Sequence, residues 1–110
     1  MLKQVQFSDG VNNVTLGTHI KFYDIGHFYL GKYHKTNIYE VLPIGFPSET
    51  DLNILGTIRW FGRWRKYCFF PASETVYEET CLGEIAEFCV RETKNHRLKK
   101  KEERTDERRD

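Results

Sequence analysis

The chain has 110 residues, of which 39% are apolar and 15% aromatic, so we expect one domain whose single core is built largely from rings. Its formal net charge of +1 disfavours a protein that attracts polyanions over its whole surface. The N-terminus lacks the apolar segment of a signal peptide, no apolar run approaches the roughly 20 residues of a membrane span, and the three cysteines form no CxxC pair. These features predict a cytoplasmic protein with reduced cysteines and no membrane contact.

Charge is distributed unevenly along the chain. Residues 91–110 hold nine Lys/Arg and six Asp/Glu, whereas residues 1–90 hold eight and ten. Within this slightly acidic first part, residues 59–66 carry four cations and no acid. Such a local island matters more for binding a small anion than the total charge does.

The first three-quarters of the chain has the pattern of short strands, because alternating segments are separated by turn-forming residues. The strand at residues 36–44 is expected to place Ile38 and Leu42 on one face of a sheet and Tyr39 and Val41 on the other. The strand candidates are residues 2–7, 13–17, 18–24, 27–34, 36–44, 54–61 and 63–70, with a turn at residues 8–10 and a loop at residues 45–53.

Two of these strands are expected to form a hairpin that holds both tryptophans of the chain. Residues 54–61 and 63–70 are separated by a tight turn at Gly62, and Pro71 ends the second strand because proline cannot donate to a ladder. Alternation mixes rings and cations on both faces near the turn and leaves both faces apolar further away. The end near the turn therefore belongs to the rim of the domain, and the other end belongs to its core.

The hydrophobic period changes after this hairpin. Residues 75–94 repeat apolar residues every three or four positions, which predicts an amphipathic helix. Thr75 and Glu78 have the spacing of a capping box. Gly83 costs about 1 kcal/mol against alanine within a helix and would allow close packing on the sheet. The charged segment 96–110 predicts a solvated helical extension or a disordered tail.

These elements together predict an α+β fold over residues 1–95. We expect an antiparallel β-sheet of about five to seven short strands with one C-terminal helix packed on one face. The charged tail at residues 96–110 then lies outside this single domain.

Catalytic motifs are not evident in the sequence. Phosphate-binding glycine loops and metal-ligand spacings are missing, so we expect no enzyme, no cofactor and no metal. His27 and His34 are expected to share a region, being seven residues apart on adjacent strand segments. Glu84 and Glu87 are interpreted as part of the solvated face of the helix rather than as an acid/base pair.

The hairpin is the candidate ligand site. Aromatic rings stack on nucleotide bases, and guanidinium groups pair with phosphate oxygens. An alternative stays open, in which the rings belong to the core and cation–π contacts only stabilise the hairpin. The predicted ligand-binding residues are Trp60 and Trp64 for stacking, Arg63, Arg65 and Lys66 for phosphates, and Tyr67 and Tyr39 for polar contacts.

Residues 35–90 also carry a pattern that resembles a family of small, uncharacterised bacteriophage and prophage proteins. The pattern has the form LGxIxW, then WRxYCFFP, then CLxxI. The matching positions are Lys35, Thr36, Tyr39, Leu55, Gly56, Ile58, Trp60, Trp64, Arg65, Tyr67 to Pro71, Cys81, Leu82, Ile85 and Phe88. The resemblance implies a phage origin and a protein that works in the cytoplasm of an infected bacterial cell.

Small phage proteins without catalytic motifs tend to act by binding. By this analogy, we expect the protein to sequester a nucleotide immune signal, such as a cyclic oligonucleotide or an ADP-ribose derivative, and to self-associate as a homo-oligomer. One alternative is an inhibitor that binds a host defence protein. Another is an accessory protein that binds single-stranded nucleic acid.

Overall fold

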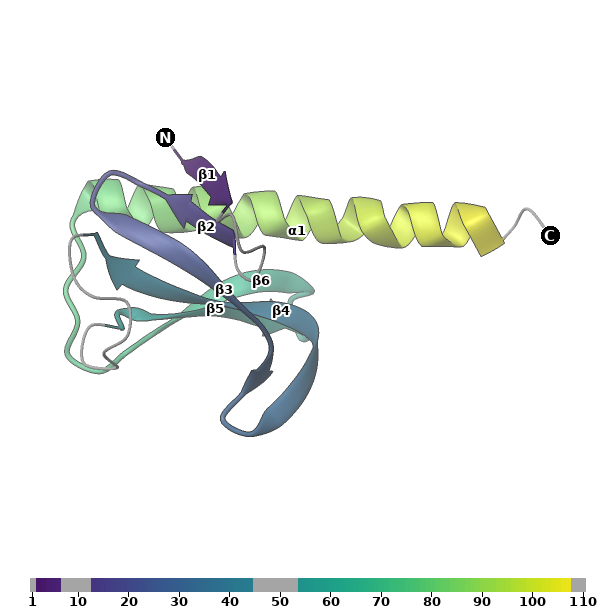
Figure 1. Ribbon diagram of the computed structural model, residues 1–110, viewed down its shortest axis with the longest axis horizontal. Coiled ribbons are helices and arrows are strands. Elements are labelled where there is room, and N and C mark those ends of the chain that lie inside the picture. Colours follow the sequence, from purple (N-terminus) through teal and green to yellow (C-terminus); the bar gives the residue numbers. More distant parts are fainter. Residues whose placement is uncertain (1, 7–12, 45–53, 108–110) are drawn as a thin grey trace.

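The computed structural model describes residues 2–6, 13–44 and 54–107, and in these residues it holds six strands followed by one long helix (Figure 1). Each strand pairs antiparallel with the next, so the sheet order equals the chain order. This confirms the predicted α+β fold. The predicted turn at residues 8–10 and loop at residues 45–53 lie outside the described residues. The elements are β1 (Lys3–Gln6), β2 (Asn13–Leu16), β3 (Ile20–Tyr29), β4 (Lys32–Pro43), β5 (Gly56–Phe61), β6 (Lys66–Pro71) and α1 (Glu79–Glu107).

The β3–β4 hairpin is longer than the sequence predicted. Residues 18–24 and 27–34 were expected to be separate strand segments, but β3 is continuous and bends at Gly26. The second segment is divided at Leu30 and Gly31, where the chain turns into β4. Gly26 has a φ of 82°, which glycine adopts without steric cost, and the register shifts on either side of it. The far end of the hairpin therefore curves away from the rest of the sheet (Figure 1).

The β5–β6 hairpin has a four-residue turn at residues 62–65. The backbone N–H groups of Trp64 and Arg65 both donate to the Phe61 carbonyl, at 3.1 and 2.9 Å. Arg65 has a φ of 54°, so the chain returns to extended geometry only at Lys66. β5 begins at Gly56 and β6 begins at Lys66, so the predicted starts of these strands at residues 54 and 63 were wrong.

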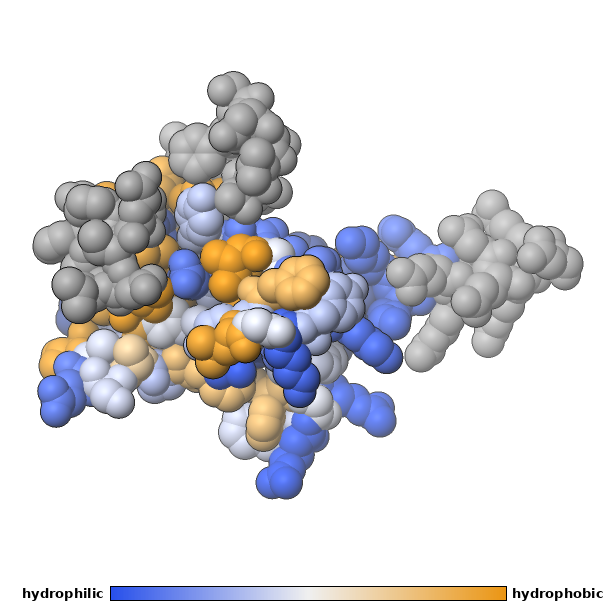
Figure 2. Space-filling view, turned by 60° about the horizontal axis from the view of Figure 1, so that its bottom comes forward, coloured by the Kyte–Doolittle hydropathy of each residue, from blue (hydrophilic) through white to orange (hydrophobic). Residues whose placement is uncertain are grey.

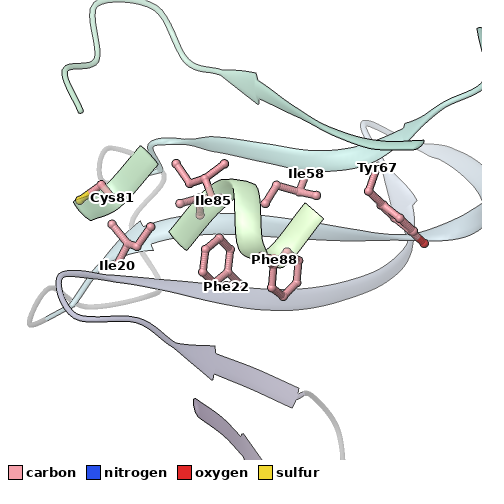
Figure 3. Packing of buried hydrophobic residues seen from close by; sticks show 8 residues of the cluster. Ile20, Phe22, Ile58, Tyr67, Cys81, Ile85 and Phe88 are labelled. Atoms are coloured by element: carbon pink, nitrogen blue, oxygen red, sulfur yellow. The ribbon is translucent and has the colours of Figure 1, made fainter. Parts of the chain in front are cut away.

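The core lies between α1 and one face of the sheet (Figure 3). Phe88 of α1 stacks on Phe22 with ring centroids 4.3 Å apart and planes within 3° of parallel. Tyr39 meets the edge of Phe88, whereas Ile38 and Leu42 are buried on the other face, as alternation predicted. The buried cluster consists of Ile20, Phe22, Val41, Ile58, Tyr67, Cys81, Ile85 and Phe88.

The start of α1 differs from the prediction. Glu78 precedes the first helical residue, and its carboxylate accepts a hydrogen bond from the Cys81 N–H, so Glu78 is the N-cap. The predicted capping box was therefore wrong, and the Thr75 hydroxyl donates instead to the Ala72 carbonyl. Tyr77 also lies before the helix, and it packs edge-on against Phe69.

Two further expectations for the helix were wrong. Gly83 is exposed, and a Cβ placed on it would meet nothing within 4 Å, so it provides no close packing on the sheet. Glu84 is only 3% exposed, whereas Glu87 is exposed as predicted. The Glu84 carboxylate accepts hydrogen bonds from the Thr18 N–H at 2.9 and 2.8 Å, so it joins α1 to the β2–β3 connection.

Beyond the core, α1 runs without a break to Glu107 and projects past the edge of the sheet (Figure 1). Thr93 holds the helix to the edge of the sheet, because its hydroxyl accepts a hydrogen bond from the Tyr67 N–H of β6. Beyond Thr93, the helix still contacts the β5–β6 hairpin, because His96 meets Trp60 and Arg97 donates to the Arg65 carbonyl. Within the described residues, α1 lacks the apolar length that crossing a membrane would require.

Candidate functional site

The predicted ligand-binding residues separate into two groups. Trp60 and Tyr67 are partners across β5 and β6 and share the face that α1 covers. Arg59 points to the opposite face, where its guanidinium carbon lies 3.9 Å from the centroid of the Phe70 ring. Lys66 is the partner of Phe61 and therefore lies on the same face as Arg59. The cationic island at residues 59–66 is thus divided between this face and the turn, and none of its cations lies on the face that α1 covers.

The turn residues Arg63, Trp64 and Arg65 lie away from the aromatic face. All three are exposed, and 65% of the Trp64 surface is accessible. The Trp64 ring meets only the edge of Phe61 among the aromatic contacts of the described residues, with centroids 5.0 Å apart. Trp64 is thus outside the core, so the alternative in which the hairpin rings belong to the core does not hold for Trp64.

A concave surface lies where the curved β3–β4 hairpin faces α1. It encloses about 620 Å³, within the range of about 300 to 1,000 Å³ typical of small-molecule sites. Of the predicted residues, Tyr39, Trp60 and Tyr67 line it. We call it the aromatic cleft. Its lining residues are His27, His34, Lys35, Thr36, Asn37, Tyr39, Trp60, Tyr67, Glu92, Asn95, His96, Lys99 and Lys100.

Four rings form the floor of the aromatic cleft. Trp60 contacts His96 at a centroid distance of 4.4 Å with a 40° tilt, and it meets Tyr67 edge-on at 5.5 Å. Tyr39 lies edge-on to Tyr67 at 6.0 Å. Trp60 is half-buried and packs against the core cluster, so it serves the core and the cleft at the same time.

Glu92 fixes the polar part of this floor. One carboxylate oxygen accepts the Tyr39 hydroxyl at 2.8 Å, and the other pairs with Arg91 Nε at 3.2 Å. Burial raises the pKa of Tyr39 far above its usual value, and the charge of Glu92 adds to the effect. Burial and then Glu92 raise the pKa of Tyr67 to about 12. Both phenols are therefore protonated at neutral pH, and because Tyr39 donates its proton to Glu92, Tyr67 is the phenol that can donate to a ligand.

The hairpin side of the aromatic cleft is held by its own hydrogen bonds. The Asn37 amide donates to both oxygens of Asp24, at 3.1 and 2.9 Å, and the Gly26 N–H donates to the same carboxylate. His27 Nδ1 lies 3.0 Å from the His34 carbonyl, so Nδ1 carries the proton of this contact. His27 and His34 therefore share a region, as the sequence predicted.

Positive charge surrounds the mouth of the aromatic cleft. Lys35 on β4 and Lys99 and Lys100 on α1 are exposed, and Glu92 is the single acid among the described lining residues. Hydrophilic side chains gather along the part of α1 that projects from the body (Figure 2). The cleft thus combines an aromatic floor with a cationic rim, which suits a planar anion.

The sequence prediction missed the helical half of this site. Glu92, His96, Lys99 and Lys100 recur every three or four residues and continue the face of α1 that carries Phe88. The spacing is a signal that the sequence contains. The prediction did not use it, because it placed residues 96–110 in a charged tail outside the domain.

The thiols do not add a reactive group to the site. Burial raises the pKa of Cys81 and of Cys89 to about 11, and it also raises the pKa of Cys68. At neutral pH all three are protonated, which makes them poor nucleophiles. Within residues 2–6, 13–44 and 54–107, no three His, Cys, Asp or Glu side chains converge in a way that could hold a metal ion.

No protein-family model, curated protein or solved structure matches the chain. The geometry and chemistry of its own residues are therefore the basis for assigning a function.

Proposed function

We propose that the protein is a non-enzymatic binding protein for a nucleotide-type anion, and that the aromatic cleft is its binding site. The observation that carries this proposal is the rim of Lys35, Lys99 and Lys100 above the ring floor of Trp60 and Tyr67. Rings of this kind contribute about 1–3 kcal/mol per stacked base, and lysines bind phosphates as point charges.

The polar groups of the cleft extend the proposal to a base. The Tyr67 hydroxyl and the Asn95 amide can donate to the edge of a purine or pyrimidine, whereas the Tyr39 hydroxyl, which donates to Glu92, can accept from it. The three predicted residues in the turn, Arg63, Trp64 and Arg65, are not needed for this ligand. Their role in ligand binding stays a prediction.

The resemblance to small phage proteins supplies the biological part of the proposal. A phage protein with such a cleft would sequester a nucleotide immune signal of the infected cell, such as a cyclic oligonucleotide or an ADP-ribose derivative. Sequestration requires only tight binding, which the rings and cations of the aromatic cleft can provide.

Titration calorimetry with a panel of cyclic di- and trinucleotides and ADP-ribose tests this proposal. We expect one class of ligand to bind the wild type, and we expect Lys35→Glu to weaken that binding at least tenfold, because it places an acid at the mouth of the cleft. Lys32→Glu is the matched control, since Lys32 is also exposed on β4 but does not line the cleft.

Two results would count against the proposal. One is a folded wild type that binds no member of the panel. The other is equal weakening by Lys32→Glu and Lys35→Glu, which would show that net charge alone governs the binding and not the cleft.

Single-stranded nucleic acid is the second candidate ligand. Residues 94–101 of α1 carry five Lys/Arg and no acid, and they adjoin rings on which bases can stack. Binding of a nucleic acid would weaken steeply with salt in proportion to the phosphates contacted. A weak salt dependence with a mononucleotide-sized ligand would instead favour the small-molecule site.

A further inference from the structure

The side of α1 that faces away from the aromatic cleft carries a second concave surface. A groove of about 420 Å³ runs between this side of the helix and the start of β6. Tyr67 reaches both concavities, but the helix residues of the groove differ from those of the cleft. The groove is lined by Lys66, Tyr67, Cys89, Val90, Thr93, Lys94, Arg97, Leu98 and Lys101.

Apolar surface is exposed in this groove. Val90 is 67% exposed and Leu98 is 49% exposed, although both lie on a helix that buries other apolar residues well. Four Lys and Arg side chains lie beside them, and the guanidinium of Arg97 donates to the Arg65 carbonyl at 3.3 Å. Among the described lining residues there is no acid, so the occupant that fits carries apolar groups and negative charge.

The N-terminal half of α1 carries those two features itself. Along the outward side of the helix, Glu79, Leu82, Ala86 and Glu87 are all exposed. Val90 lies at the midpoint between this acidic half and the basic half that includes Lys94. The outward side of α1 therefore has an acidic end, an apolar centre and a basic end.

We propose that the outward side of α1 is a dimer interface, in which a second copy of the chain packs its own α1 antiparallel across Val90. In a two-fold symmetric pair, each residue faces the one equally distant from the centre on the other helix. Glu79 and Lys101 each lie eleven positions from Val90, so each Glu79 faces a Lys101 of the second copy. Glu87 and Lys94 lie three and four positions away, so they are one residue, about 1.5 Å along the helix axis, out of exact register, which their long side chains can span.

Three physical features favour this arrangement over a parallel pair. A parallel pair places the cations of the two basic halves together, whereas the antiparallel pair joins acids to cations. Gly83 and Arg97 each lie seven positions from Val90, so in the antiparallel pair the Arg97 side chain of one copy packs over the exposed Gly83 of the other. The opposed helix dipoles also attract each other.

Dimerisation on this side leaves the aromatic cleft open, because the helix residues of the cleft, such as His96 and Lys99, lie on the other side of α1. The inference is therefore independent of the ligand. It also gives the homo-oligomer that the sequence predicted a defined contact surface.

Sedimentation velocity over a concentration series tests the proposal on the full chain. We expect the wild type to shift from monomer to dimer as concentration rises, and we expect Val90→Glu to remain monomeric, because it brings two carboxylates together at the centre. Val76→Glu is the matched control, since Val76 is 92% exposed and precedes α1. We expect this variant to dimerise as the wild type does.

A charge exchange tests the pairing itself. Lys94→Glu should weaken dimerisation at least tenfold, and the double variant Glu87→Lys with Lys94→Glu should restore it, because the swapped charges again face each other. A wild type that is monomeric at every concentration overturns the proposal. So does a double variant that stays as weak as Lys94→Glu, since it shows that these residues do not meet.

Discussion

At the scale of single residues, Glu84 shows how one side chain joins two distant elements. Its buried carboxylate accepts hydrogen bonds from the Thr18 N–H and hydroxyl. A Cβ on Gly17 would lie 2.5 Å from the same carboxylate, so the glycine leaves room for it. We expect Glu84→Ala to lower the free energy of unfolding by about 2 to 3 kcal/mol, because the Thr18 donors lose a charged acceptor.

Urea unfolding measures this effect, with Glu87→Ala as the control on the same helix. Glu87 is exposed, so its replacement should change the free energy of unfolding by less than about 0.5 kcal/mol. Equal effects of the two variants would show that the Thr18 contact does not stabilise the fold.

Protonation of Tyr67 gives a second prediction at this scale. Burial and Glu92 raise its pKa from 10.0 to about 12 in the folded state. A raised folded pKa means that the folded state holds the proton more tightly, so this contribution to stability is complete below pH 10 and is lost as the pH rises through 12. We expect stability to fall over this interval, and Tyr67→Phe should make the fall smaller. Urea midpoints measured from pH 9 to pH 12 check this, and an unchanged slope in the variant would contradict it.

At the scale of elements, replacing a glycine by alanine is expected to stabilise α1 and to destabilise the sheet. Within one chain Gly83 is exposed and has open space around its Cβ position, so Gly83→Ala should raise the free energy of unfolding of the monomer by about 1 kcal/mol, measured at a concentration below that of dimerisation. A Cβ on Gly56 would lie 2.5 Å from the Phe70 carbonyl oxygen, so Gly56→Ala should destabilise the protein by about 1 to 3 kcal/mol. Thermal unfolding should separate the two variants in opposite directions. A loss of stability in Gly83→Ala would mean that Gly83 has a contact the described residues do not show.

The contact between α1 and the edge of β6 gives another prediction at this scale. The Thr93 hydroxyl is the acceptor for the buried Tyr67 N–H, and an edge strand with open N–H groups is a site for unwanted pairing. Thr93→Val keeps the shape but removes the acceptor, so it should cost about 1–3 kcal/mol. Hydrogen exchange should then be faster at the Tyr67 amide than in the wild type. Unchanged exchange would show that another group protects this amide.

The sequence predicted elements well where the pattern is local. The alternation of Ile38 and Leu42 against Tyr39 and Val41 places residues on the correct faces, because a strand fixes the direction of each side chain. It was wrong about the end of the hairpin at residues 62–65. There a positive φ at Arg65 delays the next strand, and no propensity of arginine announces such a conformation.

At the scale of the whole molecule, the candidate site could be predicted only in part. Trp60, Tyr67 and Tyr39 were proposed from the chemistry of their rings and hydroxyls, and they line one cleft because the strand register places them on one face: Trp60 is the partner of Tyr67, and Tyr39 is the partner of Ile58. The cationic rim was not found. It depends on the curvature of the β3–β4 hairpin and on the length of α1, and both are properties of tertiary structure rather than of a short sequence pattern.

The projecting half of α1 contributes residues to the aromatic cleft but none to the buried core cluster, so truncation can test ligand binding and stability separately. The buried helix residues, from Cys81 to Phe88, all precede Asn95, so a chain that ends at Asn95 should keep its core and lose only a few degrees of thermal stability. It should lose nucleotide binding, because His96, Lys99 and Lys100 are removed from the aromatic cleft. A chain that ends at Glu102 keeps every described lining residue and should bind as the full chain does. Circular dichroism and calorimetry on both truncations check this, and unfolding of the shorter chain would show that the projecting half of α1 also stabilises the domain.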